Sequence, residues 1–188
     1  MIAEKSQMAD KVETSMTRNR EIHSDLSLSG EGHWIMRDSI TGKVKSEGNF
    51  KNLITQVGDQ VYAERGAGIM TLSAPVGAKL GTGTTTPSKT GAGAALGTYI
   101  ATSNIVHDAT YPQSALNGAS RRITYKFTFG AGVGTTATAI GEIALTNDAN
   151  ANATSTAANT VARALISPGA KAAADVLTIT WTQDALGA

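Results

Sequence analysis

The segment Ser120–Phe129 constrains the fold of this chain more than any other stretch of its sequence. Polar residues such as Arg122 and Lys126 alternate along it with the apolar residues Ile123, Tyr125, Phe127 and Phe129. Successive side chains of a β-strand point to opposite faces, so this period of two predicts a strand with one buried and one wet face. Val176–Thr182 repeats the pattern, and such strands are typical of antiparallel sheets that cover a core on one side.

Other short apolar runs lie between clusters of Gly, Thr, Pro and Asn. A hairpin is expected with strands at His33–Asp38 and Lys43–Glu47, joined by a turn at Ser39–Gly42. Further candidate strands are Ala78–Gly81, Thr98–Val106, Thr138–Leu145 and Thr160–Ser167. A set of about seven or eight short strands predicts a mainly β fold, an antiparallel β-sandwich or a jelly-roll-like barrel.

One short helix is expected within this β pattern, over Asn52–Arg65. Thr55 is a candidate N-cap, because its hydroxyl can accept a hydrogen bond from a free backbone N–H of the first turn. Gly66 stands where a helix is expected to end.

Residues 1 to 30 differ in composition from the rest and are expected to form an N-terminal arm, extended or helical, ahead of a β-sandwich domain at 31–188. The arm is polar and of mixed charge, although Met8, Val12 and Met16 have the spacing of one helix face. Two alternatives stay open, a disordered tail and an arm that becomes ordered against a neighbouring subunit.

Composition excludes several classes of function. The chain of 188 residues has a formal net charge of +1 and only 16% charged residues, which argues against nucleic acid and anionic membranes as partners. Cysteine is absent, so disulfides, thiolate catalysis and cysteine-based zinc sites are excluded. No stretch has the length of a membrane span or the apolar core of a signal peptide, so we expect synthesis and assembly in a cytosol.

Motifs that could carry catalysis are incomplete. The segment Gly83–Thr90 approaches a phosphate-binding loop, but Ser88 replaces the second glycine and Pro87 removes a backbone donor. The three histidines lack metal-ligand spacing, and they are His23, His33 and His107. His107 and Asp108 could be half of a hydrolase site, yet no nucleophile motif accompanies them. We therefore expect no enzyme activity and no catalytic, cofactor or metal site.

Glu142 and Arg163 each interrupt an apolar strand, Ile140–Leu145 and Val161–Ile166. If these strands are neighbours, the two side chains can form a cross-strand ion pair. The alternative, that both simply face solvent, is weighted slightly higher.

Four segments, in order and at similar spacing, resemble segments of virion structural proteins of tailed bacteriophages. They are Asn52–Asp59, Val76–Pro87, Ile140–Leu145, and the closing hairpin from Ala162 through Lys171 to Trp181. Gln56 and Ala144 depart from the family pattern, which more often has Asn and Gly there. The resemblance covers about residues 50 to 183 and leaves the first 30 residues outside.

The resemblance implies a β-sandwich part of a phage particle that assembles rather than catalyses. It favours a capsid decoration or cement protein that binds the major capsid protein or other virion proteins, as a homo-oligomer, with the arm contacting neighbouring subunits. A neck, tail or fibre-base component is the alternative, and so is a module that binds host glycans through the exposed loops Gly81–Gly97 and Asn147–Asn159. The expected location is the virion, assembled in the host cytoplasm.

Overall fold

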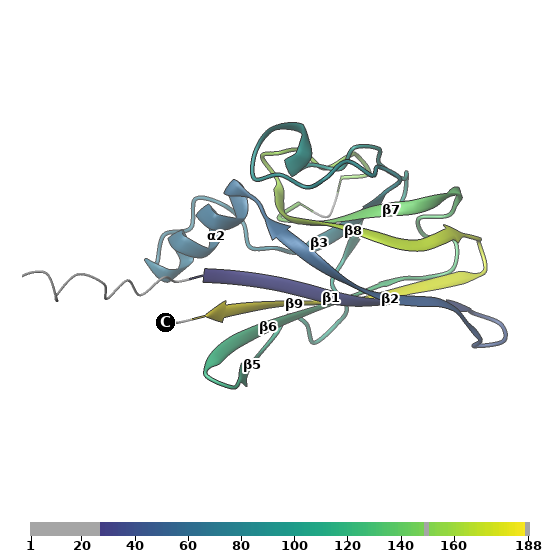
Figure 1. The fold of residues 1–188 in the computed structure, drawn as a ribbon, viewed down its shortest axis with the longest axis horizontal. Helices are drawn as coiled ribbons and strands as arrows, with labels where there is room; N and C mark the ends of the chain where they lie inside the picture. Colours follow the sequence, from purple (N-terminus) through teal and green to yellow (C-terminus); the bar gives the residue numbers. More distant parts are fainter. Residues whose placement is uncertain (1–26, 149–150, 187–188) are drawn as a thin grey trace, which may run out of the picture.

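The computed structural model describes residues 27–148 and 151–186, and these residues form a mainly β fold with one α-helix (Figure 1). The predicted fold class is therefore confirmed at the level of a mainly β, antiparallel protein. Residues 1–26 lie outside the described part, and the predicted arm falls largely on them. Ser27–Gly30, which were predicted to belong to the arm, are the first residues of a strand.

Nine strands of the described residues form one antiparallel sheet, in the order β4-β3-β7-β8-β2-β1-β9-β6-β5. Their bounds are β1 Ser27–Asp38, β2 Val44–Ile54, β3 Gly77–Gly81, β4 Ile105–Val106, β5 Gln113–Asn117, β6 Ser120–Phe129, β7 Thr136–Thr146, β8 Thr160–Lys171 and β9 Asp175–Leu186. The predicted hairpin, the alternating strands and the closing hairpin all lie within these elements.

The sheet curls so that its two halves face each other, and β2 joins them. Val44–Lys51 pairs with β1, whereas Asn52–Ile54, at the other end of the same strand, pairs with β8. Figure 1 shows the resulting two layers, with β3, β7 and β8 above β1, β9, β6 and β5. The predicted sandwich is thus a single curled sheet whose halves remain hydrogen-bonded through β2.

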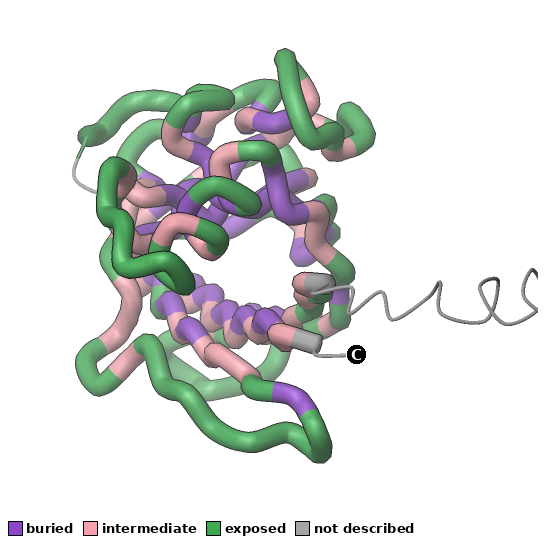
Figure 2. Tube along the Cα trace, turned by 90° about the vertical axis from the view of Figure 1, so that its left-hand side faces the viewer, coloured by how far each residue is buried: buried purple, intermediate pink, exposed green. Residues whose placement is uncertain are grey.

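The core fills the space between these layers, and the alternation seen in the sequence explains it. Phe127, Ile179 and Trp181 are buried, while their neighbours along the strands are more exposed. Figure 2 shows buried and less buried positions alternating along strands of the sheet. The ring of Phe50 meets Trp181 edge-on, with centroids 5.2 Å apart and planes at 74°, a favourable aromatic geometry.

The helix α2 (Gln56–Gly66) begins later than the sequence predicted. Asn52–Ile54 belong to β2, because pairing with β8 satisfies their backbone better than a helix could. Thr55 is the N-cap as predicted, and its hydroxyl accepts a hydrogen bond from the Gly58 N–H at 3.1 Å. That hydroxyl also lies 2.5 Å from the Thr160 carbonyl oxygen, to which it donates. The cap therefore ties the helix to β8.

One predicted strand was wrong, and one strand was not predicted. Thr98–Val106 is largely irregular, with a bridge between Tyr99 and Gly81 and a two-residue strand at Ile105–Val106. The strand β5 was missed, because its five residues carry no alternating apolar pattern. Pairing with β6 alone makes it a strand.

Candidate functional site

Glu142 on β7 and Arg163 on β8 form an ion pair in the interior of the fold. Both side chains are buried, at 0% and 1% exposure. Arg163 donates from Nε and from a terminal nitrogen to the same carboxylate oxygen, Oε2 of Glu142, at 2.9 and 2.5 Å. The solvent-facing alternative for these residues is therefore wrong, and the cross-strand pair is confirmed.

Backbone groups of the segment after β3 complete the network around this pair. The N–H groups of Gly83, Gly97 and Thr98 donate to Oε1 of Glu142 at 2.9, 2.9 and 3.1 Å. Arg163 in turn donates to the carbonyl oxygens of Thr85 and Gly93, both at 2.9 Å. A buried charge is costly unless it is paired and hydrogen-bonded, and here both charges have several partners.

Glycines make room for the Glu142 carboxylate. A Cβ atom built at Gly81 or Gly83 would lie 2.4 Å from Oε1 of Glu142, closer than any real contact. At Gly81 it would also lie 2.6 Å from the Thr98 carbonyl oxygen. Glycine is therefore required at these two positions, where the segment passes the carboxylate.

The predicted exposed loops are only partly exposed. In Gly81–Gly97, residues 84–86, 88–92 and 97 are exposed, while Ala94 and Leu96 are buried. The short 3₁₀-helix η2 (Gly91–Ala94) forms this inner turn. In Asn147–Asn159, residues 151–158 are exposed except Ser155, whose hydroxyl accepts from the Leu96 N–H at 2.9 Å. Residues 149–150 are outside the described part.

The incomplete phosphate-binding motif is held by contacts within the protein. Lys89 pairs with Asp59 of α2 at 2.5 Å, and the Lys89 carbonyl accepts from the Gln56 N–H. The Ser88 N–H donates to the Gly93 carbonyl oxygen. The segment thus connects α2 to the 3₁₀-turn.

His107 and Asp108 are adjacent, but their side chains do not form a hydrogen-bonded dyad. The Asp108 carboxylate accepts from the N–H and the hydroxyl of Thr128, at 2.9 and 2.7 Å. The ring Nδ1 of His107 lies 3.4 Å from the carbonyl oxygen of Asp108 instead. Asp108 therefore joins the loop to β6. His33 lies on β1, and His23 is outside the described residues.

A second buried carboxylate, Asp175, anchors the other end of the sheet. Both oxygens accept from Lys45 Nζ, at 2.9 and 2.8 Å, and one also accepts from the Ala172 N–H. Burial raises the pKa of Asp175, but the hydrogen bonds from Lys45 and Ala172 outweigh it, so the pKa is lowered overall. Asp175 thereby fastens the turn between β8 and β9 to β2.

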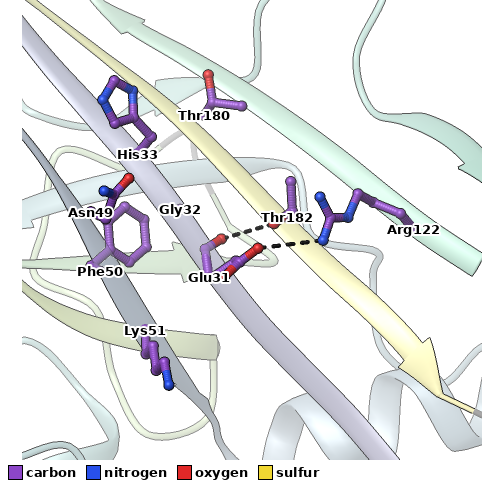
Figure 3. A pocket seen from close by; sticks show the side chains of 9 residues that line it. All are labelled: Glu31, Gly32, His33, Asn49, Phe50, Lys51, Arg122, Thr180 and Thr182. Carbon is purple, nitrogen blue, oxygen red and sulfur yellow. Dashed lines mark hydrogen bonds and ion pairs between the residues drawn. The ribbon is translucent and has the colours of Figure 1, made fainter. Parts of the chain in front are cut away.

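The outward face of the sheet carries a shallow groove of about 640 Å³. Its lining comes from the four neighbouring strands β2, β1, β9 and β6, as Figure 3 shows. The side chains that line it are Glu31, His33, Asn49, Lys51, Arg122, Thr180 and Thr182. Gly32 and Phe50 also border it, but the Phe50 ring packs against Trp181 in the core. The alternation in the sequence predicts that Arg122 and the threonines face solvent. It does not predict that they lie beside residues of β1 and β2, because that depends on the order of the strands in the sheet.

Arg122 organises the charges of this groove. It donates to both oxygens of Asp184 at 2.8 and 2.7 Å and reaches Glu31 at 3.4 Å. The hydrogen bonds from Arg122 lower the pKa of Asp184. The groove therefore presents hydroxyl, amide, imidazole and ammonium groups beside an already neutralised guanidinium.

No family model, curated protein or solved structure that we compared with the chain matches it. In residues 27–148 and 151–186, no helix is long and apolar enough to cross a membrane. The same residues contain no group of three or more histidine, aspartate or glutamate side chains that could hold a metal ion.

Proposed function

We propose that this chain is a non-enzymatic structural component of a tailed-bacteriophage particle. Within the particle we propose a capsid decoration or cement protein that binds and stabilises the shell. A neck, tail or fibre-base component is the alternative within the same proposal. The resemblance in four segments suggests this class, and the way these segments meet in space supports it.

The observation that carries the proposal is that parts of all four resembling segments meet around or beside the buried ion pair, although the end of the closing hairpin, in β9, lies in the other half of the sheet. Val76–Pro87 supplies β3 and the Gly83 amide, Ile140–Leu145 supplies Glu142, and the closing hairpin supplies Arg163. Asn52–Asp59 contains the Thr55 cap, which donates to the β8 backbone. The residues that carry the resemblance thus act together to hold loops against the sheet.

A rigid presentation of loops suits a protein whose task is docking. In the segment from Gly83 to Thr98, three backbone N–H groups donate to Glu142 and two backbone carbonyl oxygens accept from Arg163. Surfaces that are ordered before binding lose less conformational entropy on association. On a shell with many repeated sites, weak contacts of this kind combine into strong attachment.

The test is to measure this polypeptide in purified phage particles by quantitative mass spectrometry and to locate it in the particle by electron cryomicroscopy. A copy number comparable with that of the major capsid protein supports decoration of the shell. A few copies per particle indicate the neck, tail or fibre base. Absence from intact particles would refute the structural role.

The arm is tested by deletion of residues 1–26. The deletion has to end there, because Ser27–Gly30 pair with β9 and their loss would remove part of the sheet. We expect reduced incorporation of the truncated protein into particles. Undiminished incorporation would eliminate the arm from the proposal and leave the sheet as the attachment site.

Glycan binding is a second candidate function, and the groove on the outward face favours it. Hydroxyl and amide groups at Thr180, Thr182 and Asn49 can pair with sugar hydroxyls. A glycan array with the wild-type protein and an Asn49→Ala, Thr180→Val variant tests it. Binding that the variant loses supports this function, and an array without any signal excludes it for the sugars displayed.

A further inference from the structure

The strand β5 is the open edge of the sheet. It pairs with β6 on one side, and all five of its residues, Gln113–Asn117, are exposed. In the described part of the chain, no backbone hydrogen bond joins the other side of β5 to another segment. Figure 1 shows β5 at the outer margin of the lower layer.

The hairpin geometry determines which backbone groups of β5 are free. Asn117 pairs with Ser120 across a two-residue turn at Gly118, whose φ is +60°. Such a turn closes on a hydrogen-bonded pair, so Gln113, Ala115 and Asn117 direct their backbone groups to β6. The N–H and C=O groups of Ser114 and Leu116 therefore point away from the sheet.

This edge lacks the features that keep edge strands from pairing. Natural edges are protected by charged residues, by proline within the strand or by shortness. The opposite edge, β4, has two residues, but β5 has five, and residues 109–120 contain no charged side chain. Leu116 is moreover 75% exposed.

We propose that β5 pairs with β5 of a second copy of this chain, antiparallel and across a two-fold axis at Ala115. This interface rests on the proposed structural function, since it supplies the contact between neighbouring copies. The sheet then continues from one copy into the next.

The sequence of β5 is complementary to itself in this register. Ala115 meets Ala115 of the second copy on the axis, Ser114 lies opposite Leu116, and Gln113 lies opposite Asn117. Two Ser114–Leu116 pairs exchange the free backbone hydrogen bonds, and the small alanines allow close approach. Leu116 of one copy comes beside Ser114, which pairs on its other side with the half-buried Ile123. The exposed Leu116 thereby lies on the same face as Ile123, with Ser114 between them.

Electrostatics permit the pairing. The nearest basic residues, Arg121 and Arg122, lie on β6. In the dimer two β5 strands lie between the β6 strands of the two copies, so the arginine backbones are separated by three strand spacings, about 14 Å. This distance exceeds the screening length of about 8 Å at physiological salt. Arg122 is in addition neutralised by Asp184.

A cysteine scan of the full chain tests the interface, because the natural sequence contains no cysteine. In the proposed register the Cα atoms at position 115 are about 4.5 Å apart, within the range of a disulfide. Position 113 of one copy lies opposite position 117 of the other. The two positions 113 are therefore offset by four residues, about 13 Å along the strand. We expect Ala115→Cys to form a covalent dimer under mild oxidation at least tenfold faster than Gln113→Cys or the exposed helix-end variant Ala67→Cys.

A charge pair provides the complementary measurement. Ala115→Lys and Ala115→Glu should each sediment as monomers at concentrations where the wild type and Ala67→Lys dimerise, and their equimolar mixture should dimerise again. Equal cross-linking at all three cysteine positions, or cross-linking of Ala115→Cys to another particle protein in place of a second copy, would overturn the proposal. If the chain occurs in particles but does not cross-link at position 115, the interface fails and the structural role stands. If it cross-links but is absent from particles, the reverse holds.

Discussion

Arg163 and Glu142 meet through a single carboxylate oxygen, which leaves the other oxygen of Glu142 free to accept three backbone N–H groups. The ion pair therefore links two strands and also holds a loop. Oε2 links β7 to β8 and also lies 3.1 Å from the Gly97 nitrogen, while Oε1 holds the ends of the segment from Gly83 to Thr98. The loop conformation and the sheet are thereby coupled.

Glu142→Gln should destabilise the protein by about 3–5 kcal/mol, because it leaves the Arg163 charge buried without its counter-ion. Urea denaturation followed by tryptophan fluorescence measures this loss, since Trp34 and Trp181 are both buried in the core. The double variant Glu142→Gln, Arg163→Met should lose less than the sum of the two single variants. Additive losses would show that the two charges act independently.

Gly81→Ala should destabilise the protein by about 1–3 kcal/mol, the usual cost of forcing an extra methyl group into a packed interior. The added methyl group would press on the Thr98 carbonyl oxygen as well as on Glu142, and the backbone cannot easily yield there. Gly66→Ala is the matched control, because open space surrounds that position. Thermal unfolding should separate the two variants, and equal melting temperatures would contradict the steric explanation.

Thr55→Ala should destabilise the protein by about 1–2 kcal/mol through loss of the helix cap. The hydroxyl also donates to the β8 backbone, so the value should lie near the upper end of this range. Thr55→Ser retains the hydroxyl and should recover most of the lost stability. If serine and alanine were equally destabilising, the methyl group rather than the hydrogen bonds would be responsible.

Acid should weaken the fold through Asp184 and Asp175, whose pKa values are both lowered in the folded protein. A carboxyl group with a lowered pKa contributes stability above its unfolded value of about 3.9, and this contribution is lost as the pH falls toward the folded pKa. The urea midpoint should therefore decline below about pH 4.5. Asp184→Asn should flatten this decline, and an unchanged slope in that variant would contradict the explanation.

The sequence alone determined the elements that depend on local pattern. Alternation at Ile123–Phe129 and Leu177–Trp181 predicted two central strands and their buried faces, because side-chain direction in a strand follows from the backbone itself. Thr55 as helix cap also followed from local chemistry. The helix start was misplaced, since pairing of Asn52–Ile54 with a distant strand competes with helix formation in a way that sequence does not display.

The positions of the Glu142–Arg163 ion pair and of the open edge strand β5 depend on the tertiary structure alone. Glu142 and Arg163 are 21 residues apart, and a strand register places them in contact. Their burial then depended on amides from Gly83, Gly97 and Thr98, which no pattern connects to them. β5 likewise became a strand through β6, because hydrogen bonding between strands acts over space and requires no signal in the strand's own sequence.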